Sequence, residues 1–254
     1  MIPWKTLATV ATDEGALQLR QRGEREFLIV IDGRVLMTSN DRRSELGLAT
    51  LACDGLPANP RVLIGGLGMA YTVRAALDAL PAAAELTVAE LTPAVADWCK
   101  GPLAPLTGAA VLDRRVRIAI GDVSRMIADA PRGHYHAIIL DLYEGPHAAT
   151  QGRDDPFYGG AALLRSKAAL APGGVLAVWS EDPDAAFVRR FAHVGFDVAT
   201  HRLGKTRKHV VYIGRRRPDA PAERPAERSI KRPPERVTTR GRGRPARGTA
   251  RRPA

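Results

Sequence analysis

Two different patterns of apolar and polar positions divide the chain. In residues 16–38 (ALQLRQRGEREFLIVIDGRVLMT), short apolar runs alternate with turn signals such as Asp32-Gly33. Asp-Gly between β-prone runs is typical of a tight hairpin, because glycine tolerates a positive φ. The pattern predicts a small β-hairpin module, followed by a helix that Ser44 caps and that stops near Gly55.

From Arg61 onward, apolar runs with few charges alternate with segments of helical periodicity. The expected strands are 61–66, 86–91, 116–122, 135–141, 174–180, 195–203 and 208–214, and the expected helices are 70–80, 95–100, 124–129, 156–170 and 182–194. Apolar strands separated by helices indicate a parallel sheet that is covered on both faces. The short link 204–207 makes the last two strands an antiparallel edge pair. The predicted fold class is α/β, a doubly wound Rossmann-like sheet with this edge pair, preceded by the β-hairpin module.

The net charge of +11 belongs mainly to the C-terminal segment. Residues 215–254 hold 14 Lys and Arg against four acids, which leaves about +1 for the rest of the chain. This segment has seven prolines and almost no apolar clusters, so burial cannot offset the entropy of ordering it. We therefore expect an N-terminal β-rich module with a linking helix (1–55), a nucleotide-binding transferase domain (56–214) and a disordered basic tail (215–254).

The remaining composition indicates a cytoplasmic protein. Cys53 and Cys99 have no Cys-x-x-Cys spacing and are expected to be reduced thiols. The first 15 residues lack the pattern of a signal peptide, and no apolar run approaches the roughly 20 residues that span a bilayer. No contact with a membrane is expected.

A glycine-rich turn, VLIGGLGMAYT, follows the first strand of the predicted sheet. Gly65, Gly66 and Gly68 would let backbone N–H groups and a helix N-terminus approach a polar ligand. A tight strand–helix connection has the same composition, so the turn is weak evidence by itself.

Acids close the next two strands. Glu90 follows Gly65 by 25 residues, a position from which a carboxylate can accept both hydroxyls of a ribose. Asp122, in Gly121-Asp122-Val123, can accept the exocyclic amine of an adenine or cap the following helix, and one residue can do both. The alternative for Glu90 is a solvated acid at a strand end.

A fourth strand end carries Asp141-Leu-Tyr-Glu144-Gly-Pro. Because ligands bind at the carboxyl ends of parallel strands, these two carboxylates would lie near the reactive end of a nucleotide cofactor. The alternatives are a strand-end acid and a turn residue. His134 and His136 have no matching ligands nearby, so no metal site is expected.

Together these motifs resemble those of a known protein family. Residues 16–213 resemble the spermidine synthase-like proteins, a branch of the class I S-adenosylmethionine-dependent methyltransferase fold. The resemblance rests on RVLIGGLGMAYT, TVAEL, IGDV, HAIILDLYEGP, PFYGGAALL and APGGVLAVWSE, and IDGRVLMTSNDRRSELGLATLA resembles that family's β-rich leader. It implies that Gly65–Gly68 contact the methionine part of the cofactor, Glu90 its ribose and Asp122 its adenine. The expected cofactor-binding residues are Gly65, Gly66, Gly68, Glu90, Asp122, Val123 and Asp141.

The chain departs from the family at two of these motifs. Aminopropyltransferases carry GGGDGG in the turn, where the acid anchors the free amine of decarboxylated S-adenosylmethionine, and this acid falls at Gly68. The family's catalytic DSxD pair becomes Asp141 and Glu144, which are the expected catalytic residues. The first could deprotonate an attacking amine.

The favoured expectation is therefore a transferase that moves a methyl group from S-adenosylmethionine to a small acceptor. The alternative is aminopropyl transfer from decarboxylated S-adenosylmethionine to an amine. A second alternative is a non-catalytic, nucleic-acid-associated protein that binds through its tail. Arg242-Gly-Arg244-Pro245 faintly resembles an AT-hook, but a basic extension that binds any polyanion is favoured. The resemblance also implies a homodimer.

Overall fold

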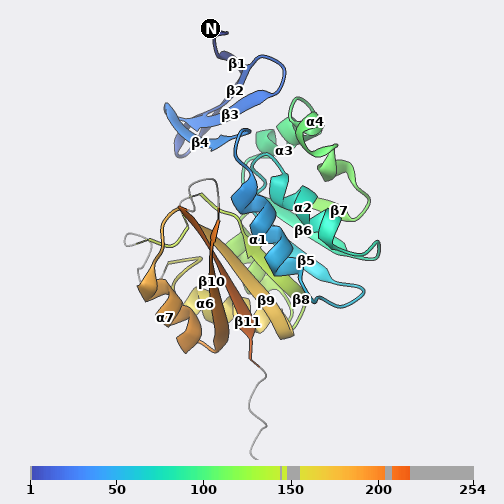
Figure 1. The fold of residues 1–254 in the computed structure, drawn as a ribbon, viewed down its shortest axis with the longest axis vertical. Coiled ribbons are helices and arrows are strands. Elements are labelled where there is room, and N and C mark those ends of the chain that lie inside the picture. Colours follow the sequence, from blue (N-terminus) through green and yellow to red (C-terminus); the bar gives the residue numbers. More distant parts are fainter. Residues whose placement is uncertain (1, 144, 148–154, 204–207, 218–254) are drawn as a thin grey trace, which may run out of the picture. The chain divides into compact units, whose positions relative to one another are not determined.

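A computed structural model describes residues 2–143, 145–147, 155–203 and 208–217 of the chain. It contains two sheets, one of four antiparallel strands at the N-terminus and one of seven mostly parallel strands (Figure 1). The expected α/β fold is confirmed, including the antiparallel pair at one edge.

The N-terminal sheet has the strand order β1-β2-β3-β4. Its strands are β1 (Lys5–Thr12), β2 (Gly15–Arg22), β3 (Glu26–Ile31) and β4 (Arg34–Thr38). The hairpin expected around Asp32-Gly33 joins β3 to β4, and Asp32 and Gly33 both have positive φ. The sequence prediction missed β1, although Thr, Val and alternating Ala in KTLATVAT suit a half-exposed strand.

The large sheet has the order β10-β11-β9-β8-β5-β6-β7. Its strands are β5 (Arg61–Gly65), β6 (Glu85–Glu90), β7 (Val116–Ile120), β8 (Tyr135–Leu140), β9 (Leu170–Ser180), β10 (Phe196–Leu203) and β11 (His209–Arg216). The helices are α1 (Arg43–Cys53), α2 (Tyr71–Ala79), α3 (Pro93–Lys100), α4 (Ala104–Thr107), α5 (Val123–Asp129), α6 (Gly160–Ala169) and α7 (Ala185–His193), with a 3-10 turn at Ala110–Leu112. The last two strands pair antiparallel, and β11 lies between β10 and β9.

Alternation along each strand builds a core on both faces of the large sheet. Val62 and Ile64 face a cluster shared with α1, α2 and the N-terminal sheet, whereas Leu63 faces a second cluster with α5, α6 and α7. Strand residues buried on both faces explain why the sequence shows continuous apolar runs rather than alternation.

Two local predictions are corrected by the structure. Ser44 does not cap α1, because the N-cap is Arg42 without a side-chain hydrogen bond and Ser44 lies buried in the first turn. The predicted start of the tail at residue 215 falls inside β11, which continues to Arg216. The Arg216 guanidinium donates to the carbonyl of Leu170, so it is part of the folded sheet.

Candidate active site

The parallel register brings three of the sequence motifs to one edge of the large sheet. Gly65 in β5 lies opposite Ala89 in β6 on one side and Leu140 in β8 on the other. The residues that follow, Gly66, Glu90 and Asp141, therefore leave the sheet side by side. Gly66 donates its N–H to the carbonyl of Ala89 at 2.9 Å, and Asp141 donates to that of Gly65 at 2.9 Å.

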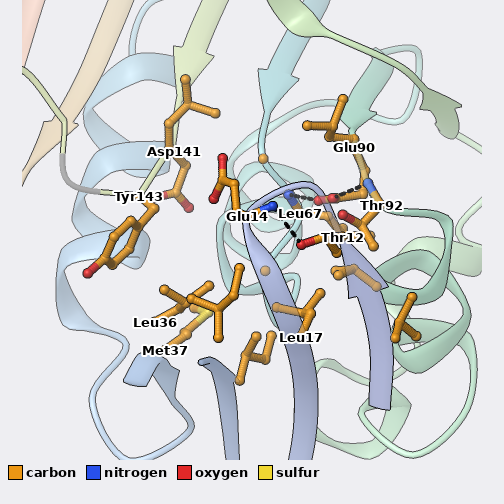
Figure 2. A pocket seen from close by; sticks show the side chains of 18 of the residues that line it. Thr12, Glu14, Leu17, Leu36, Met37, Leu67, Glu90, Thr92, Asp141 and Tyr143 are labelled. Atoms are coloured by element: carbon orange, nitrogen blue, oxygen red, sulfur yellow. Dashed lines mark hydrogen bonds between the residues drawn. The ribbon is translucent and has the colours of Figure 1, made fainter. Parts of the chain in front are cut away.

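A cavity of about 670 Å³ opens at this edge (Figure 2). Residues from both sheets line it: Val10–Glu14, Leu17, Ile29, Ile31, Leu36, Met37, Glu45, Gly66–Gly68, Glu90–Pro93, Val95, Asp141–Tyr143 and Trp179. Its size suits a nucleoside with a short side chain. The strands of the N-terminal sheet contribute mainly apolar side chains to the wall, whereas its carboxylates come from the β1–β2 turn, from α1 and from the ends of β6 and β8.

The glycine turn has a backbone that only small residues fit. Gly66 has φ +88°, and a Cβ atom there would lie 2.3 Å from the carbonyl oxygen of Asp141. Gly68 has φ +50°, and a Cβ atom there would meet Sδ of Met37 at 2.8 Å. The turn therefore approaches the cavity with bare backbone, as a cofactor-binding turn requires.

Glu90 is held at the end of β6 by the turn beside it. Its Oε2 accepts the backbone N–H of Leu67 at 3.0 Å, and its Oε1 accepts that of Thr92 at 2.8 Å (Figure 2). Each oxygen keeps a further lone pair for a ligand hydroxyl. Burial raises the pKa of Glu90, while backbone N–H groups, that of Thr92 most strongly, oppose that rise.

Asp141 lies at the end of β8 with its carboxylate turned into the cavity (Figure 2). Its Oδ2 accepts a hydrogen bond of 2.5 Å from the hydroxyl of Thr72 in α2. Burial, and next the negative charge of Glu45, raise the pKa of Asp141 to about 7, and the Thr72 hydrogen bond opposes this rise. A carboxyl with a pKa near neutrality can act as a general base.

The predicted adenine contacts lie apart from this cavity. Asp122 is the N-cap of α5, where Oδ1 accepts from the N–H of Ser124 at 2.7 Å and Oδ2 from its hydroxyl at 2.9 Å. Neither Asp122 nor Val123 lines the cavity, and the side chain of Val123 packs beside Gly65. The capping alternative is thus confirmed for Asp122, and the adenine role stays a prediction.

The second expected catalytic residue, Glu144, lies outside the described residues. Its neighbour Tyr143 lines the cavity and is covered by the guanidinium of Arg34, 4.6 Å from the ring centroid. Tyr158 does not line the cavity and is buried in the core against Phe187.

Sequence reasoning missed three acids of the cavity. Asp13 and Glu14 come from the turn between β1 and β2, and Glu45 comes from the first turn of α1. The hydroxyl of Ser44 donates to Oε2 of Glu45 at 2.7 Å and also lies 3.1 Å from Nδ1 of His209. Asp-Glu-Gly between two β-prone runs was a turn signal, but nothing local indicated that this turn reaches the glycine turn.

Two curated proteins are similar in sequence to part of this chain. A stretch of 160 residues is 33% identical to polyamine aminopropyltransferase 2 of Streptomyces coelicolor, covering 62% of this chain and 28% of the relative. A stretch of 155 residues is 26% identical to spermidine synthase 2 of Hyoscyamus niger, covering 61% of this chain and 48% of the relative. The chain thus matches less than half the length of either curated relative. No protein-family model matches it.

The structural comparison covers more of the chain. The crystal structure of spermidine synthase from Thermotoga maritima superposes with a TM-score of 0.67, over 83% of this chain and 72% of that one, at 18% identity. This chain has the spermidine synthase fold. A second spermidine synthase structure, in complex with the transition-state analogue AdoDATO, gives a TM-score of 0.66 at 19% identity, over 83% of this chain and 73% of that one. At such identities the likeness establishes the fold, including the separate N-terminal sheet.

The comparisons also bear on the predicted reaction. The curated relatives are named as an aminopropyltransferase and a spermidine synthase, so the methyl transfer that was expected from Gly68 finds no support among them. The predicted nucleic-acid contact falls largely on residues 218–254, outside the described part of the chain. Within the described part, no helix has the length and apolarity needed to cross a membrane.

Proposed function

We propose that this protein is an aminopropyltransferase that moves the aminopropyl group of decarboxylated S-adenosylmethionine to a small amine. The observation that supports this reaction most directly is the charge of the cavity. Its acids are Asp13, Glu14, Glu45, Glu90 and Asp141, and no Lys, Arg or His is among the described residues that line it. Such a wall suits positively charged ligands.

The same charge discriminates between the two forms of the cofactor. Decarboxylated S-adenosylmethionine carries a sulfonium and an ammonium, whereas the intact form adds a carboxylate. A carboxylate close to Asp141 and Glu14 would be repelled, with no cationic side chain in the lining to offset the repulsion. Gly68 alone suggested a preference for intact S-adenosylmethionine. Glu14 and Glu45, which make the cavity acidic, are distant from the glycine turn in the sequence and did not enter that prediction.

The predicted cofactor residues fit this ligand. The two oxygens of Glu90 are oriented by Leu67 and Thr92 and can accept ribose hydroxyls. The bare backbone of Gly66 and Gly68 leaves room for the chain that runs from the ribose through the sulfur. Apolar side chains such as Leu17 on the N-terminal sheet exclude water from the cavity.

The chemistry that follows is a single displacement. The acceptor nitrogen forms a bond to the aminopropyl carbon next to sulfur, the C–S bond breaks, and its electron pair stays on sulfur as a neutral thioether. The proton of the acceptor amine goes to Asp141, whose pKa of about 7 matches this task. Much of the rate would come from holding the amine in line with the C–S bond.

The test is a product assay with both sulfonium donors. The purified full chain is incubated with a diamine such as 1,4-diaminobutane and either donor, and the products are identified by mass spectrometry. We expect an aminopropylated amine and a thioether nucleoside from the decarboxylated donor only. A methylated amine from the intact donor would contradict the proposal, and so would tighter binding of the intact donor by calorimetry.

A loss of activity in Asp141→Asn would show that this site, and not a contaminating enzyme, catalyses the reaction. Asp129→Asn is the matched control, since Asp129 is an exposed acid at the end of α5, away from the cavity. We expect the Asp129 variant to keep full activity. An equal loss in both variants would contradict the assignment of Asp141.

A further inference from the structure

The turn between β1 and β2 places an acidic side chain over the glycine turn. Figure 2 shows the side chain of Glu14 between Asp141 and Leu67, with its carboxylate turned toward that of Asp141. The backbone holds this turn, because Glu14 donates its N–H to the hydroxyl of Thr12 at 3.3 Å, and that hydroxyl donates to the carbonyl of Gly15 at 2.8 Å. Glu14 therefore faces the cavity from a short hairpin turn that these two hydrogen bonds stabilise.

Three other carboxylates of the cavity already accept hydrogen bonds from the protein. Glu90 accepts two backbone N–H groups, Asp141 accepts the Thr72 hydroxyl, and Glu45 accepts the Ser44 hydroxyl. Within the described part of the chain, the carboxylate of Glu14 has no hydrogen-bond or ion-pair partner. An unpaired carboxylate that points at a second carboxylate is a favourable place for an ammonium group.

A side chain at Gly68 of the glycine turn would require a neighbouring side chain to move. At Gly68, the sulfur of Met37 occupies the place next to where a Cβ atom would stand, at 2.8 Å, and the φ of +50° disfavours a side chain. Met37 comes from β4 of the N-terminal sheet, the same sheet that carries Glu14. The N-terminal sheet thus places Met37 against Gly68 of the turn, and the hairpin of the same sheet places the carboxylate of Glu14 at the cavity.

We propose that Glu14 binds the ammonium of the aminopropyl group of decarboxylated S-adenosylmethionine and so determines which form of the cofactor is accepted. This inference rests on the proposed function. The ammonium would lie between Glu14 and Asp141, above the turn at Gly68. In intact S-adenosylmethionine a carboxylate on the same carbon would approach Glu14, so the one residue attracts the first cofactor and repels the second.

Calorimetry of the full chain with both cofactors tests this role. We expect Glu14→Gln to weaken binding of decarboxylated S-adenosylmethionine by about tenfold or more. Intact S-adenosylmethionine should bind the variant as well as the wild type or more tightly, so the preference between the two falls. Glu14→Asp keeps the charge and should restore part of the preference.

Glu24→Gln is the matched control, because Glu24 is an exposed acid in the β2–β3 turn of the same sheet and does not line the cavity. It should leave both affinities unchanged. Thermal unfolding of each variant identifies any that is misfolded, and Glu14 is exposed, so folding should be unaffected.

Three results would overturn the inference, and they differ in what they leave standing. An unchanged preference in Glu14→Gln would remove the role of Glu14 while the aminopropyl reaction of the wild type stands. A raised KM for the amine with unchanged cofactor affinity would assign Glu14 to the acceptor instead. A wild type that binds intact S-adenosylmethionine more tightly would overturn the proposed function itself.

Discussion

Leu67 and Glu90 are joined by a hydrogen bond of 3.0 Å from the backbone N–H of the glycine turn to Oε2 of the carboxylate. The bond connects two strand ends that are neighbours in the sheet, since β5 pairs with β6. It fixes the orientation of the carboxylate before any ligand arrives. A nucleoside that binds there meets a prepared acceptor, which lowers the entropic cost of binding.

Glu90→Gln should weaken binding of the sulfonium donor by about 10- to 100-fold. The amide would turn one NH₂ group toward the N–H of Leu67 or Thr92, so one of these donors loses its acceptor. Calorimetry measures the affinity, and mass spectrometry shows whether any copurifying nucleoside is lost. Glu85→Gln, at the exposed start of the same strand, is the control and should bind normally. Equal affinity in Glu90→Gln and wild type would contradict the ribose role.

The rate of amine transfer should rise with pH through about 7. Asp141 must be deprotonated to accept a proton, and its pKa is raised to about 7. The pH profile of kcat/KM measures this limb, and Asp141→Asn should remove it together with most of the activity. If the rise of kcat/KM with pH persists unchanged in the variant, a group other than Asp141 is responsible for it.

The charged form of Asp141 should lower the free energy of unfolding at high pH. Its pKa in the folded chain is above the ordinary value of 3.8, so the fold binds the proton more tightly than the unfolded chain does. The stabilisation by this group is complete below pH 3.8 and is lost as the pH rises toward 7. Asp141→Asn should therefore raise the free energy of unfolding at pH 8 by about 2 kcal/mol, measured by urea titration. A lower stability of the variant at pH 8 would contradict the raised pKa.

Thr72→Val should move the acidic limb of the activity profile to higher pH. The Thr72 hydroxyl donates to Asp141 and stabilises its charged form, so its removal raises the pKa of Asp141 further. Thr72→Ser keeps the hydroxyl and should retain the wild-type limb. If the valine and serine variants titrate alike, the hydrogen bond does not control the base.

Gly66→Ala should destabilise the fold by about 3 kcal/mol or more, because the new Cβ atom would lie 2.3 Å from the carbonyl oxygen of Asp141 in a backbone with positive φ. Gly23→Ala is the matched control, since Gly23 has φ +59° and nothing within 4 Å of the new atom. It should cost only about 1 kcal/mol. Thermal or urea unfolding measures both, and equal losses would show that steric contact at the turn is unimportant.

Removal of residues 220–254 should abolish salt-sensitive binding to duplex DNA while leaving amine transfer intact. This cut follows the boundary of the compact unit at Asp219 and keeps β11 whole, whereas a cut at 215 would remove Arg216 from the sheet. For the full chain, affinity should fall about 100-fold between 50 and 200 mM salt. Loss of amine transfer in the truncated chain would show that the segment has a catalytic part.

Local pattern was sufficient to predict most of the large sheet. Runs such as RVLIG and YHAIIL are apolar without alternation, because both faces of these strands are buried, and every strand of that sheet was expected near its observed place. Pattern was weaker in the N-terminal sheet, where β1 is half-exposed and its residues also suit a loop.

The sequence by itself determined which residues stand at the ends of the parallel strands. Gly66 and Asp141 directly follow apolar strands and Glu90 ends one, and parallel register then brings the three to one edge. This inference needs only the period of each strand and the rule that ligands bind at carboxyl ends.

Only the tertiary structure decided the charge of the cavity. Gly68 lacks an acid, and the sequence alone therefore suggested a site suited to an intact cofactor. Glu14 and Glu45 supply acids from segments that come before the large sheet in the chain, because the N-terminal sheet and α1 share a core with it and lead these residues to its edge. Electrostatic character is the sum over all groups that meet in space, and distance along the chain carries no information about which groups those are.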